Sequence, residues 1–264
     1  MKADFHTHSI YSFDGSESLD AIVQSAIKKG LTAIAITDHL DLSIDLKPSI
    51  SRPLLIEYYN EAKALKEKYK DNINLIVGIE IGYRKNLTDE LLRIIDGLDF
   101  ELVINSVHDI DEYDLFIEPF YIKNNKQQAY DKYLNTILDS LNAPYNYDIV
   151  GHIGYVERKA VYKDVKIYYN DHKDTLNEIF DTIMQKHKFL EINTNCYGLD
   201  HFIPNPELVQ AFINRCKQKN YKLPDCYLSK YSLTKDAPIL FGSDAHRVER
   251  IMDGYQKVID LLNE

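Results

Sequence analysis

Two histidines separated by one residue, His6 and His8, lie near the N-terminus and follow a short apolar segment at residues 3–5. In an extended segment the side chains of residues i and i+2 point to the same face. Both imidazoles could therefore bind one metal ion. The pair alone does not establish a metal site, because a histidine at the end of a strand is more often a hydrogen-bonded structural residue than a ligand.

Further side chains of the metal-ligand type occur where other predicted strands end. They are four histidines and two carboxylates: His39, His108, His152, His246, Glu80 and Asp244. Histidines scattered over a core or a surface would not gather at strand ends, so the pattern favours a metal site. Imidazole and carboxylate ligands without cysteine suit Zn, Mn or Fe, and the sequence does not choose among these metals.

The elements that would position these residues alternate between strands and helices. We predict seven apolar strands, at residues 3–5, 32–36, 74–79, 101–105, 148–151, 189–192 and 238–241. Amphipathic helices are predicted at residues 19–29, 54–69, 89–95, 127–141, 174–187 and 250–262. The alternation predicts parallel strands with right-handed crossovers that close into a barrel. In such barrels the active site lies at the C-terminal ends of the strands, where the candidate ligands stand.

Other histidines and acidic residues have a different interpretation. His172, His187 and His201 lie in predicted helices or loops, and we expect them to be ordinary core or surface histidines. Glu191 is expected to be structural, because the interior of its strand would hide it from the site. Asp38 could orient a metal ligand as a hydrogen-bond acceptor, or it could cap a helix.

Composition narrows the class of protein. The 264 residues, of which 45% are hydrophobic and 27% charged, suit a single α/β domain at residues 1–264. Three cysteines without close pairing, no signal peptide and no apolar run near the roughly 20 residues of a membrane span predict a cytoplasmic protein. The net charge of −10 argues against nucleic acid as a partner. The sequence contains no glycine-rich nucleotide-binding motif.

On four motifs the chain resembles the PHP (polymerase and histidinol phosphatase) superfamily of metal-dependent phosphoesterases. The motifs are His6-Thr7-His8, Thr37-Asp38-His39, Ser106-Val107-His108 and Ser243-Asp244-Ala245-His246. Glu80 and His152 lie between them in the expected order, and the resemblance covers essentially the whole chain. It implies a distorted, TIM-like (β/α)7 barrel. Within the superfamily it implies a stand-alone histidinol-phosphate phosphatase, which hydrolyses L-histidinol phosphate to L-histidinol and phosphate.

The resemblance also implies a centre of three divalent metal ions. The first ion would be bound by His6, His8, Glu80 and Asp244. The second would be bound by Glu80, His108 and His152. The third would be bound by Asp14, His39 and His246, where many relatives have a histidine in place of Asp14. The catalytic residues implied are Glu80, His108, His152, Asp244 and His246.

Clustered divalent metals suit the hydrolysis of a phosphate monoester, which carries close to two negative charges and repels hydroxide. They lower the pKa of a bridging water towards about 7 and hold the attacking and leaving oxygens of an in-line displacement. We therefore expect direct attack by a metal-bridging hydroxide, without a phosphoenzyme intermediate.

Cationic side chains should complete the binding of the phosphate. Guanidinium groups match phosphate in a bidentate way, and two arginines, Arg158 and Arg247, closely follow predicted ligands in the sequence. We predict both as phosphate contacts, and Arg84 and Lys85 are weaker candidates.

A small-molecule substrate that carries an amine and an imidazole calls for acidic or polar contacts. The candidates are Asp109, Glu112 and Asn193. The long loop at residues 40–53, which contains two prolines, is a candidate lid.

Two alternative functions remain open. The first is a phosphoesterase of the same superfamily that acts on nucleotides or phosphotyrosine, although the acidic chain does not suggest the basic groove of an exonuclease. The second is a non-catalytic, metal-stabilised scaffold, against which the complete set of ligands argues.

Overall fold

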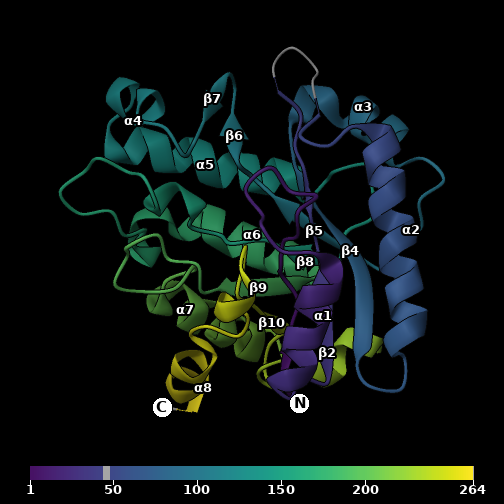
Figure 1. Ribbon diagram of the computed structural model, residues 1–264. Coiled ribbons are helices and arrows are strands. Elements are labelled where there is room, and N and C mark those ends of the chain that lie inside the picture. Colours follow the sequence, from purple (N-terminus) through teal and green to yellow (C-terminus); the bar gives the residue numbers. More distant parts are fainter. Residues whose placement is uncertain (44–47, 264) are drawn as a thin grey trace.

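The computed structural model describes residues 1–43 and 48–263. Its centre is a parallel sheet with the strand order β1-β2-β4-β5-β8-β9-β10 (Figure 1). These strands are β1 (Ala3–Asp4), β2 (Ala33–Ile36), β4 (Asn74–Gly82), β5 (Leu102–Ser106), β8 (Ile149–Val150), β9 (Phe189–Asn193) and β10 (Ile239–Gly242). A further short strand, β3 (His39–Leu40), follows β2 and pairs with β4. Nearly all strand residues are buried, which explains why apolar runs mark them in the sequence.

The first and last strands close the sheet into a barrel. The backbone N–H of Phe5, directly after β1, donates to the carbonyl oxygen of Phe241 in β10 at 3.0 Å. Beyond the strand ends, the N–H of Asp244 donates to the carbonyl oxygen of His6 at 2.8 Å. The seven strands therefore form the nearly closed (β/α)7 barrel that the alternation of strands and helices predicts.

Helices surround the barrel (Figure 1). They are α1 (Leu19–Lys28), α2 (Arg52–Tyr69), α3 (Thr88–Ile95), α4 (Pro119–Lys123), α5 (Lys126–Ser140), α6 (Lys173–Gln185), α7 (Pro206–Gln218) and α8 (Tyr255–Asn263). Side-chain caps define three of the starts: Ser18 accepts from the N–H of Ala21 at α1, Asn125 and Gln128 form a capping box at α5, and Asn205 caps α7. No helix in the described part of the chain is both long and apolar enough to cross a membrane.

A small apolar core fills the barrel, separate from the larger core between strands and helices. In β2, Ala33 and Ala35 belong to this inner core, whereas the two isoleucines of the strand belong to the outer one. A 3-10 turn at Tyr227–Tyr231 closes the N-terminal end, where the ring centroids of Tyr231 and Phe5 are 5.3 Å apart. The buried histidines that follow the strands lie at the opposite, C-terminal end of the barrel.

Several elements differ from the sequence prediction. The hairpin of β6 (Asp109–Ile110) and β7 (Tyr113–Asp114) is not predicted, because its strands are too short to show a pattern. Helices α4 and α7 are also missed, although α7 has an Asn205 cap and Pro206 in its first turn. Helix α8 begins later than predicted, because the preceding Gly254 has a φ of +76°, which is incompatible with a helix.

The candidate lid at residues 40–53 is described only in part, since residues 44–47 lie outside the described residues. On either side of them, Leu42 and Pro48 form an antiparallel bridge. Helix α2 then begins at Arg52, inside the segment predicted as loop.

Candidate metal centre

The carboxylate of Glu80 is fully buried and lies within 3.3 Å of four histidines at the C-terminal end of the barrel. Its Oε2 atom lies 2.9 Å from His39 Nδ1 and 3.2 Å from His6 Nε2. Its Oε1 atom lies 2.9 Å from His152 Nε2 and 3.3 Å from His108 Nε2. Because these histidines follow or belong to four different strands, the barrel itself brings them to one carboxylate.

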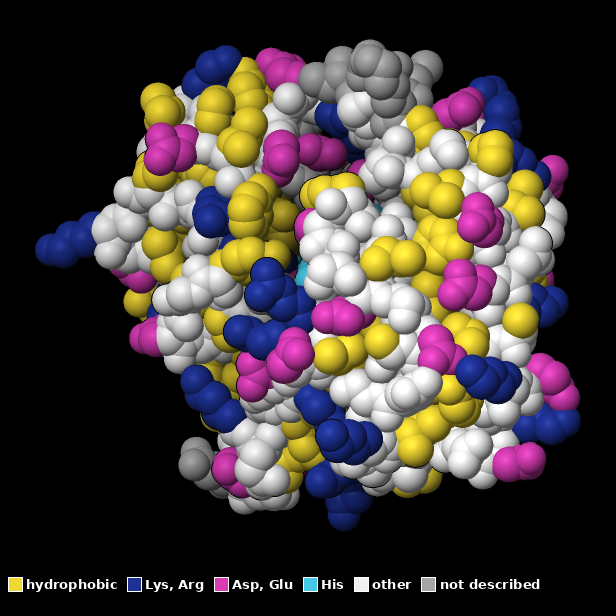
Figure 2. Space-filling view, in the orientation of Figure 1, with side chains coloured by type: hydrophobic (Ala, Val, Ile, Leu, Met, Phe, Trp, Pro, Cys, Tyr) yellow, Lys and Arg dark blue, Asp and Glu magenta, His cyan; other side chains and the backbone are white. Residues whose placement is uncertain are grey.

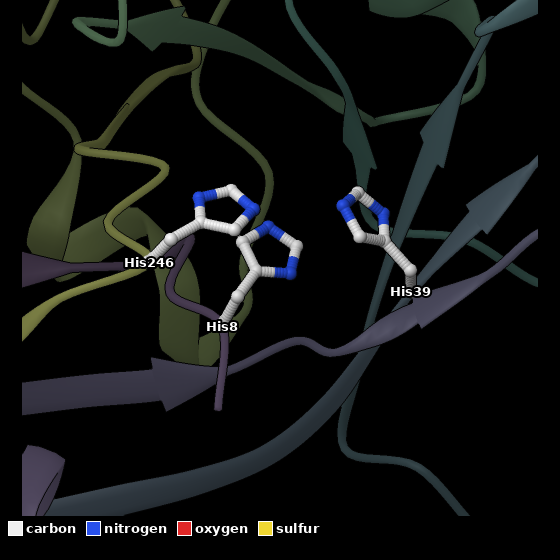
Figure 3. Close-up of side chains that lie close together, drawn as sticks. All are labelled: His8, His39 and His246. Carbon is white, nitrogen blue, oxygen red and sulfur yellow. The ribbon is translucent and has the colours of Figure 1, made fainter. Parts of the chain in front are cut away.

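A second carboxylate, Asp244, follows β10, and its Oδ1 atom lies 3.2 Å from His8 Nε2. Nearby, Asp14 Oδ2 lies 3.1 Å from His246 Nε2, and Asp14 Oδ1 lies 3.8 Å from His39 Nε2. The rings of His8, His39 and His246 come from three separate segments and lie close together (Figure 3). The structure thus brings all nine predicted ligand residues to one place.

The ligand atoms form three groups, in each of which all atoms lie within 4.8 Å of one another. The groups are His6, His8 and Glu80; His39, Glu80 and His108; and His8, His39 and His246. Among the described residues, His6 Nε2, His8 Nε2 and Glu80 Oε2 are buried without a hydrogen-bond partner. Buried polar atoms that converge in this way fit metal ligands. The grouping differs from the implied one at His39, which joins Glu80 and His108, and at His8, which joins His39 and His246. Asp14, His152 and Asp244 belong to none of the three groups.

Burial and neighbouring charges act differently on the individual ligands. Burial lowers the pKa of His6 and of His108, but nearby carboxylates outweigh burial and raise both pKa values well above the usual value, so a metal ion must displace a proton from each ring. Burial lowers the pKa of His8 well below its usual value, and two neighbouring imidazoles lower it further, so its ring is neutral. Burial alone would raise the pKa of Glu80, but the positive charge of His6 and His108 holds this pKa well below its usual value. The Glu80 carboxylate is therefore ionised.

Asp41, which is not among the predicted site residues, orients His108. Asp41 Oδ1 lies 2.8 Å from His108 Nδ1, which leaves the other ring nitrogen to face Glu80. Gly82, at the end of β4, leaves room for this contact, because a Cβ there would overlap Asp41 Oδ1. One signal in the sequence is the position of Asp41 two residues after His39, a predicted ligand.

Asp38 helps to orient His8, which is the first of the two roles expected for it. Its Oδ1 atom accepts hydrogen bonds from the N–H of Ser9 at 2.7 Å and from the hydroxyl of Ser12 at 2.6 Å. The Ser12 hydroxyl lies 3.1 Å from His8 Nδ1. Asp38 therefore positions a predicted ligand through a serine and caps no described helix.

The expectation that the strand hides Glu191 from the site is wrong. Glu191 is buried in β9, but its Oε1 atom lies 2.6 Å from His6 Nδ1. Its Oε2 atom accepts a hydrogen bond from the backbone N–H of His152 at 2.7 Å. Phe189, two residues earlier, belongs to the inner core, so Glu191 also points into the barrel. A side chain that points into the barrel near the end of a strand therefore faces the site.

A cavity of about 920 Å³ opens at this end of the barrel. Its lining includes all five predicted catalytic residues: Glu80, His108, His152, Asp244 and His246. Figure 2 shows histidine atoms at the bottom of a narrow opening that hydrophobic side chains flank. A cavity of this size accommodates a small organic phosphate.

Arg158 lines the cavity and is buried. Its Nη2 atom donates hydrogen bonds to Asp244 Oδ2 at 3.0 Å and to Asn193 Oδ1 at 2.9 Å. Its guanidinium carbon lies 4.8 Å from the ring centroid of Tyr155 and 5.1 Å from that of Tyr197. Asn193 itself is fully buried and is not part of the cavity lining, so it contacts Arg158 on the side that faces away from the cavity.

The other predicted substrate contacts are placed unequally. Asp109 and Glu112 line the cavity, as does Arg84. Burial raises the pKa of Asp109 to about 6, although Arg84 opposes this rise. Lys85 does not line the cavity and pairs with a surface carboxylate. Arg247 is exposed and is also absent from the lining, so the structure does not bring it to the site.

The three histidines outside the predicted ligand set lie away from the cavity lining. His172 Nδ1 lies 2.9 Å from a carboxylate oxygen of Asp131, and His201 Nε2 lies 2.7 Å from Glu157 Oε2. His187 is exposed. Their placement agrees with the expectation that they are ordinary core or surface histidines.

A seven-stranded (β/α) barrel with histidines and carboxylates converging at its C-terminal end defines a barrel protein with a site of the metal-binding type. The family model of the PHP domain matches residues 4–195, which is more than half of the 264-residue chain. The chain therefore belongs to the PHP family.

Relatives cover most of the chain. The histidinol-phosphatase of Lactococcus lactis subsp. lactis is 34% identical over 198 residues, which are 74% of this chain and 72% of that protein. The crystal structure of a histidinol phosphate phosphatase from the same organism, in complex with Zn, L-histidinol and phosphate, has a TM-score of 0.82 at 29% identity. The similarity covers 99% of this chain and 92% of that one. A structure from Listeria monocytogenes shares the fold, with a TM-score of 0.74, 19% identity and coverage of 97% and 99% of the two chains.

Proposed function

We propose that this protein hydrolyses L-histidinol phosphate to L-histidinol and phosphate in a metal-dependent reaction. The observation that carries the proposal is the position of Arg158, whose buried guanidinium lines the same cavity as the histidine–carboxylate centre. Metal ligands next to a phosphate-binding cation suit a phosphomonoesterase. The substrate is supported by the similarity to the Lactococcus lactis enzyme and to its complex with Zn, L-histidinol and phosphate.

Three divalent ions of Zn, Mn or Fe would be held by the nine predicted ligand residues: His6, His8, Asp14, His39, Glu80, His108, His152, Asp244 and His246. When bound, such ions neutralise phosphoryl oxygens and lower the pKa of a coordinated water, so that a nucleophile exists at neutral pH. The central position of Glu80, within 3.3 Å of four imidazoles, supports its role as a shared ligand.

Arg158 would bind the phosphate through the part of its guanidinium that the protein leaves free. Its Nη2 atom already contacts Asp244 and Asn193, which fixes the plane of the group. The residue contributes to the cavity wall, from which its guanidinium can donate to a phosphoryl oxygen. The rings of Tyr155 and Tyr197 keep water from the guanidinium, which strengthens its attraction for the phosphate.

The leaving group of this substrate carries an amine and an imidazole, and acidic side chains suit both. Asp109 and Glu112 contribute to the wall of the cavity. We propose that they bind the L-histidinol part of the substrate, whereas Arg158 and the metals bind its phosphate.

One barrel accounts for the chain, and we propose a single domain at residues 1–264. The backbone contacts between Phe5 and Phe241 support this, because they join the first and last strands. The partner we propose is this small-molecule phosphate, and a net charge of −10 disfavours nucleic acid.

Phosphate release from L-histidinol phosphate tests this function. The purified protein is assayed as isolated, after removal of metal by a chelator, and after return of Zn, Mn or Fe, with the metal content measured each time. We expect turnover that chelation abolishes and that at least one of the three metals restores. Undiminished turnover by metal-free protein, or no turnover with any metal, would contradict the proposal.

A further inference from the structure

We propose that Glu191 is a positioning residue, which fixes the tautomer of the His6 ring and holds the backbone of His152 with the same carboxylate. The inference rests on the proposed function only in taking both histidines as metal ligands. It assigns a role to a buried acidic residue that lies behind the centre and does not line the cavity.

Three hydrogen-bond donors converge on the Glu191 carboxylate. His6 Nδ1 lies 2.6 Å from Oε1, and the amide nitrogen of Asn193 donates to the same oxygen at 3.3 Å. The backbone N–H of His152 donates to Oε2 at 2.7 Å. A carboxylate has acceptor sites on both of its oxygens, so it satisfies all three neighbours at once. It also joins the C-terminal ends of β1, β8 and β9.

The contact with Glu191 determines which nitrogen of His6 can bind a metal. Because the carboxylate accepts, the proton of the neutral ring must reside on Nδ1. The lone pair then lies on Nε2, which faces Glu80 Oε2 at 3.2 Å and Asp244 Oδ1 at 3.8 Å. A metal-binding nitrogen must be unprotonated, so Glu191 selects the tautomer that binds.

The neighbouring strand leaves room for this arrangement. Gly242, at the end of β10, lies beside the Glu191 carboxylate, and a Cβ there would overlap Oε1. The same Cβ would come within 2.8 Å of the Cβ of His6. The glycine therefore permits the direct contact between the carboxylate and the ring.

The substitution Glu191→Gln separates this role from packing, because glutamine has the same shape. Its amide offers one acceptor and one donor group. The backbone N–H of His152 can only donate, so it will bond to the amide oxygen of the glutamine. The NH2 group of the glutamine then faces His6 Nδ1. His6 must then accept at Nδ1 and carry its proton on Nε2, where it blocks metal binding.

The experiment compares metal retention by the purified metal-loaded wild type, Glu191→Gln and Glu157→Gln in graded concentrations of a chelator. Glu157 is the matched control, because it is also a buried carboxylate bound to a histidine, His201, and it touches none of the predicted ligands. We expect Glu191→Gln to hold metal about 10- to 100-fold more weakly, as removal of such an orienting partner does elsewhere. Glu157→Gln should match the wild type.

A second measurement needs no variant and therefore does not depend on the folding of one. The 15N NMR spectrum of the Zn-loaded wild type, labelled at histidine, reports the protonated nitrogen of each ring. We expect His6 to be protonated at Nδ1, with Nε2 bound to metal. Protonation of His6 at Nε2, or metal retention by a folded Glu191→Gln equal to that of the wild type, would overturn the inference.

Neither readout involves a substrate, so the two proposals can fail separately. Metal binding that depends on Glu191, in a protein that releases no phosphate from L-histidinol phosphate, would overturn the proposed function and support the inference.

Discussion

Arg158 and Asp244 form a buried ion pair, in which Arg158 Nη2 donates to Asp244 Oδ2 at 3.0 Å. The other carboxylate oxygen of Asp244 lies 3.2 Å from His8 Nε2. One carboxylate thus touches both the proposed phosphate contact and a predicted metal ligand. The guanidinium is thereby held at a fixed position relative to the metal centre, and this position favours a reaction at a phosphate group.

Replacement of Arg158 by lysine should impair substrate binding. A lysine retains the charge but cannot contact Asp244 and a phosphate with one planar group, so kcat/KM for L-histidinol phosphate should fall by about 100-fold. Steady-state kinetics measure the loss, with KM expected to rise more than kcat falls and the metal content unchanged. The control is Arg247→Lys, at an exposed arginine outside the cavity lining, which should stay within about twofold of the wild type. Equal losses in the two variants would remove Arg158 from the site.

The substitution Glu80→Gln should abolish turnover. The amide is neutral and carries two N–H donors, so it cannot serve four neighbouring imidazoles as a shared anionic ligand. We expect activity to drop more than about 1,000-fold together with a loss of bound metal, because metal ligands and catalysis coincide here. Elemental analysis and circular dichroism would show that metal is lost while the barrel remains folded. Full activity of this variant would contradict the shared ligand.

Asp41→Asn should weaken metal binding without removing a ligand. Burial alone would raise the pKa of Asp41, but the adjacent His108 lowers it, so the group that faces His108 Nδ1 is an ionised carboxylate. Its loss should weaken the retention of metal by about 10- to 100-fold in a chelator titration. Asp139→Asn, at a carboxylate that pairs with Lys85 outside the cavity lining, provides the comparison. A folded Asp41→Asn variant with unchanged metal retention would show that His108 needs no such partner.

His201 should make the stability of the protein depend on pH. Burial lowers the pKa of His201, but Glu157 and Asp200 outweigh burial and raise it. A raised pKa in the folded state stabilises the protein fully below the unfolded pKa of about 6.5, and this contribution is lost as the pH rises through the folded value. The difference in unfolding free energy between the wild type and His201→Gln should therefore be larger near about pH 6 than near about pH 9. Denaturant titrations at fixed metal concentration measure it. An equal difference at both pH values would show that the charge of His201 has no role.

The sequence predicts the strands well, and the structure brings the predicted metal-ligand residues together, because both predictions depend on residue type and order along the chain. The sequence does not predict the carboxylates that hydrogen-bond to the ligand histidines. Asp41 is separated from His108 by 67 positions, and the pairing of β3 and β5 with β4 brings the two together. Glu191 is separated from His6 by 185 positions, and the closure of the barrel between β1 and β10 brings these two together. A strand pattern shows that Glu191 is buried, but it does not show that the buried side faces the site.

Sequence proximity also misleads in one case. Arg247 directly follows His246, yet its side chain is exposed, because adjacent residues in an extended segment point in opposite directions. Arg158, six positions after His152, reaches the site because a 3-10 turn at Tyr155–Glu157 brings the chain back towards the cavity.

Substrate preference tests the central claim most directly. The values of kcat/KM for L-histidinol phosphate, phosphotyrosine, a nucleoside 3′,5′-bisphosphate and an aryl phosphate are measured with one preparation of known metal content. We predict that L-histidinol phosphate is preferred by at least about 300-fold, which corresponds to more than about 3 kcal/mol of differential transition-state binding. A flat profile, or a preference for the nucleotide or for phosphotyrosine, would contradict the proposed substrate.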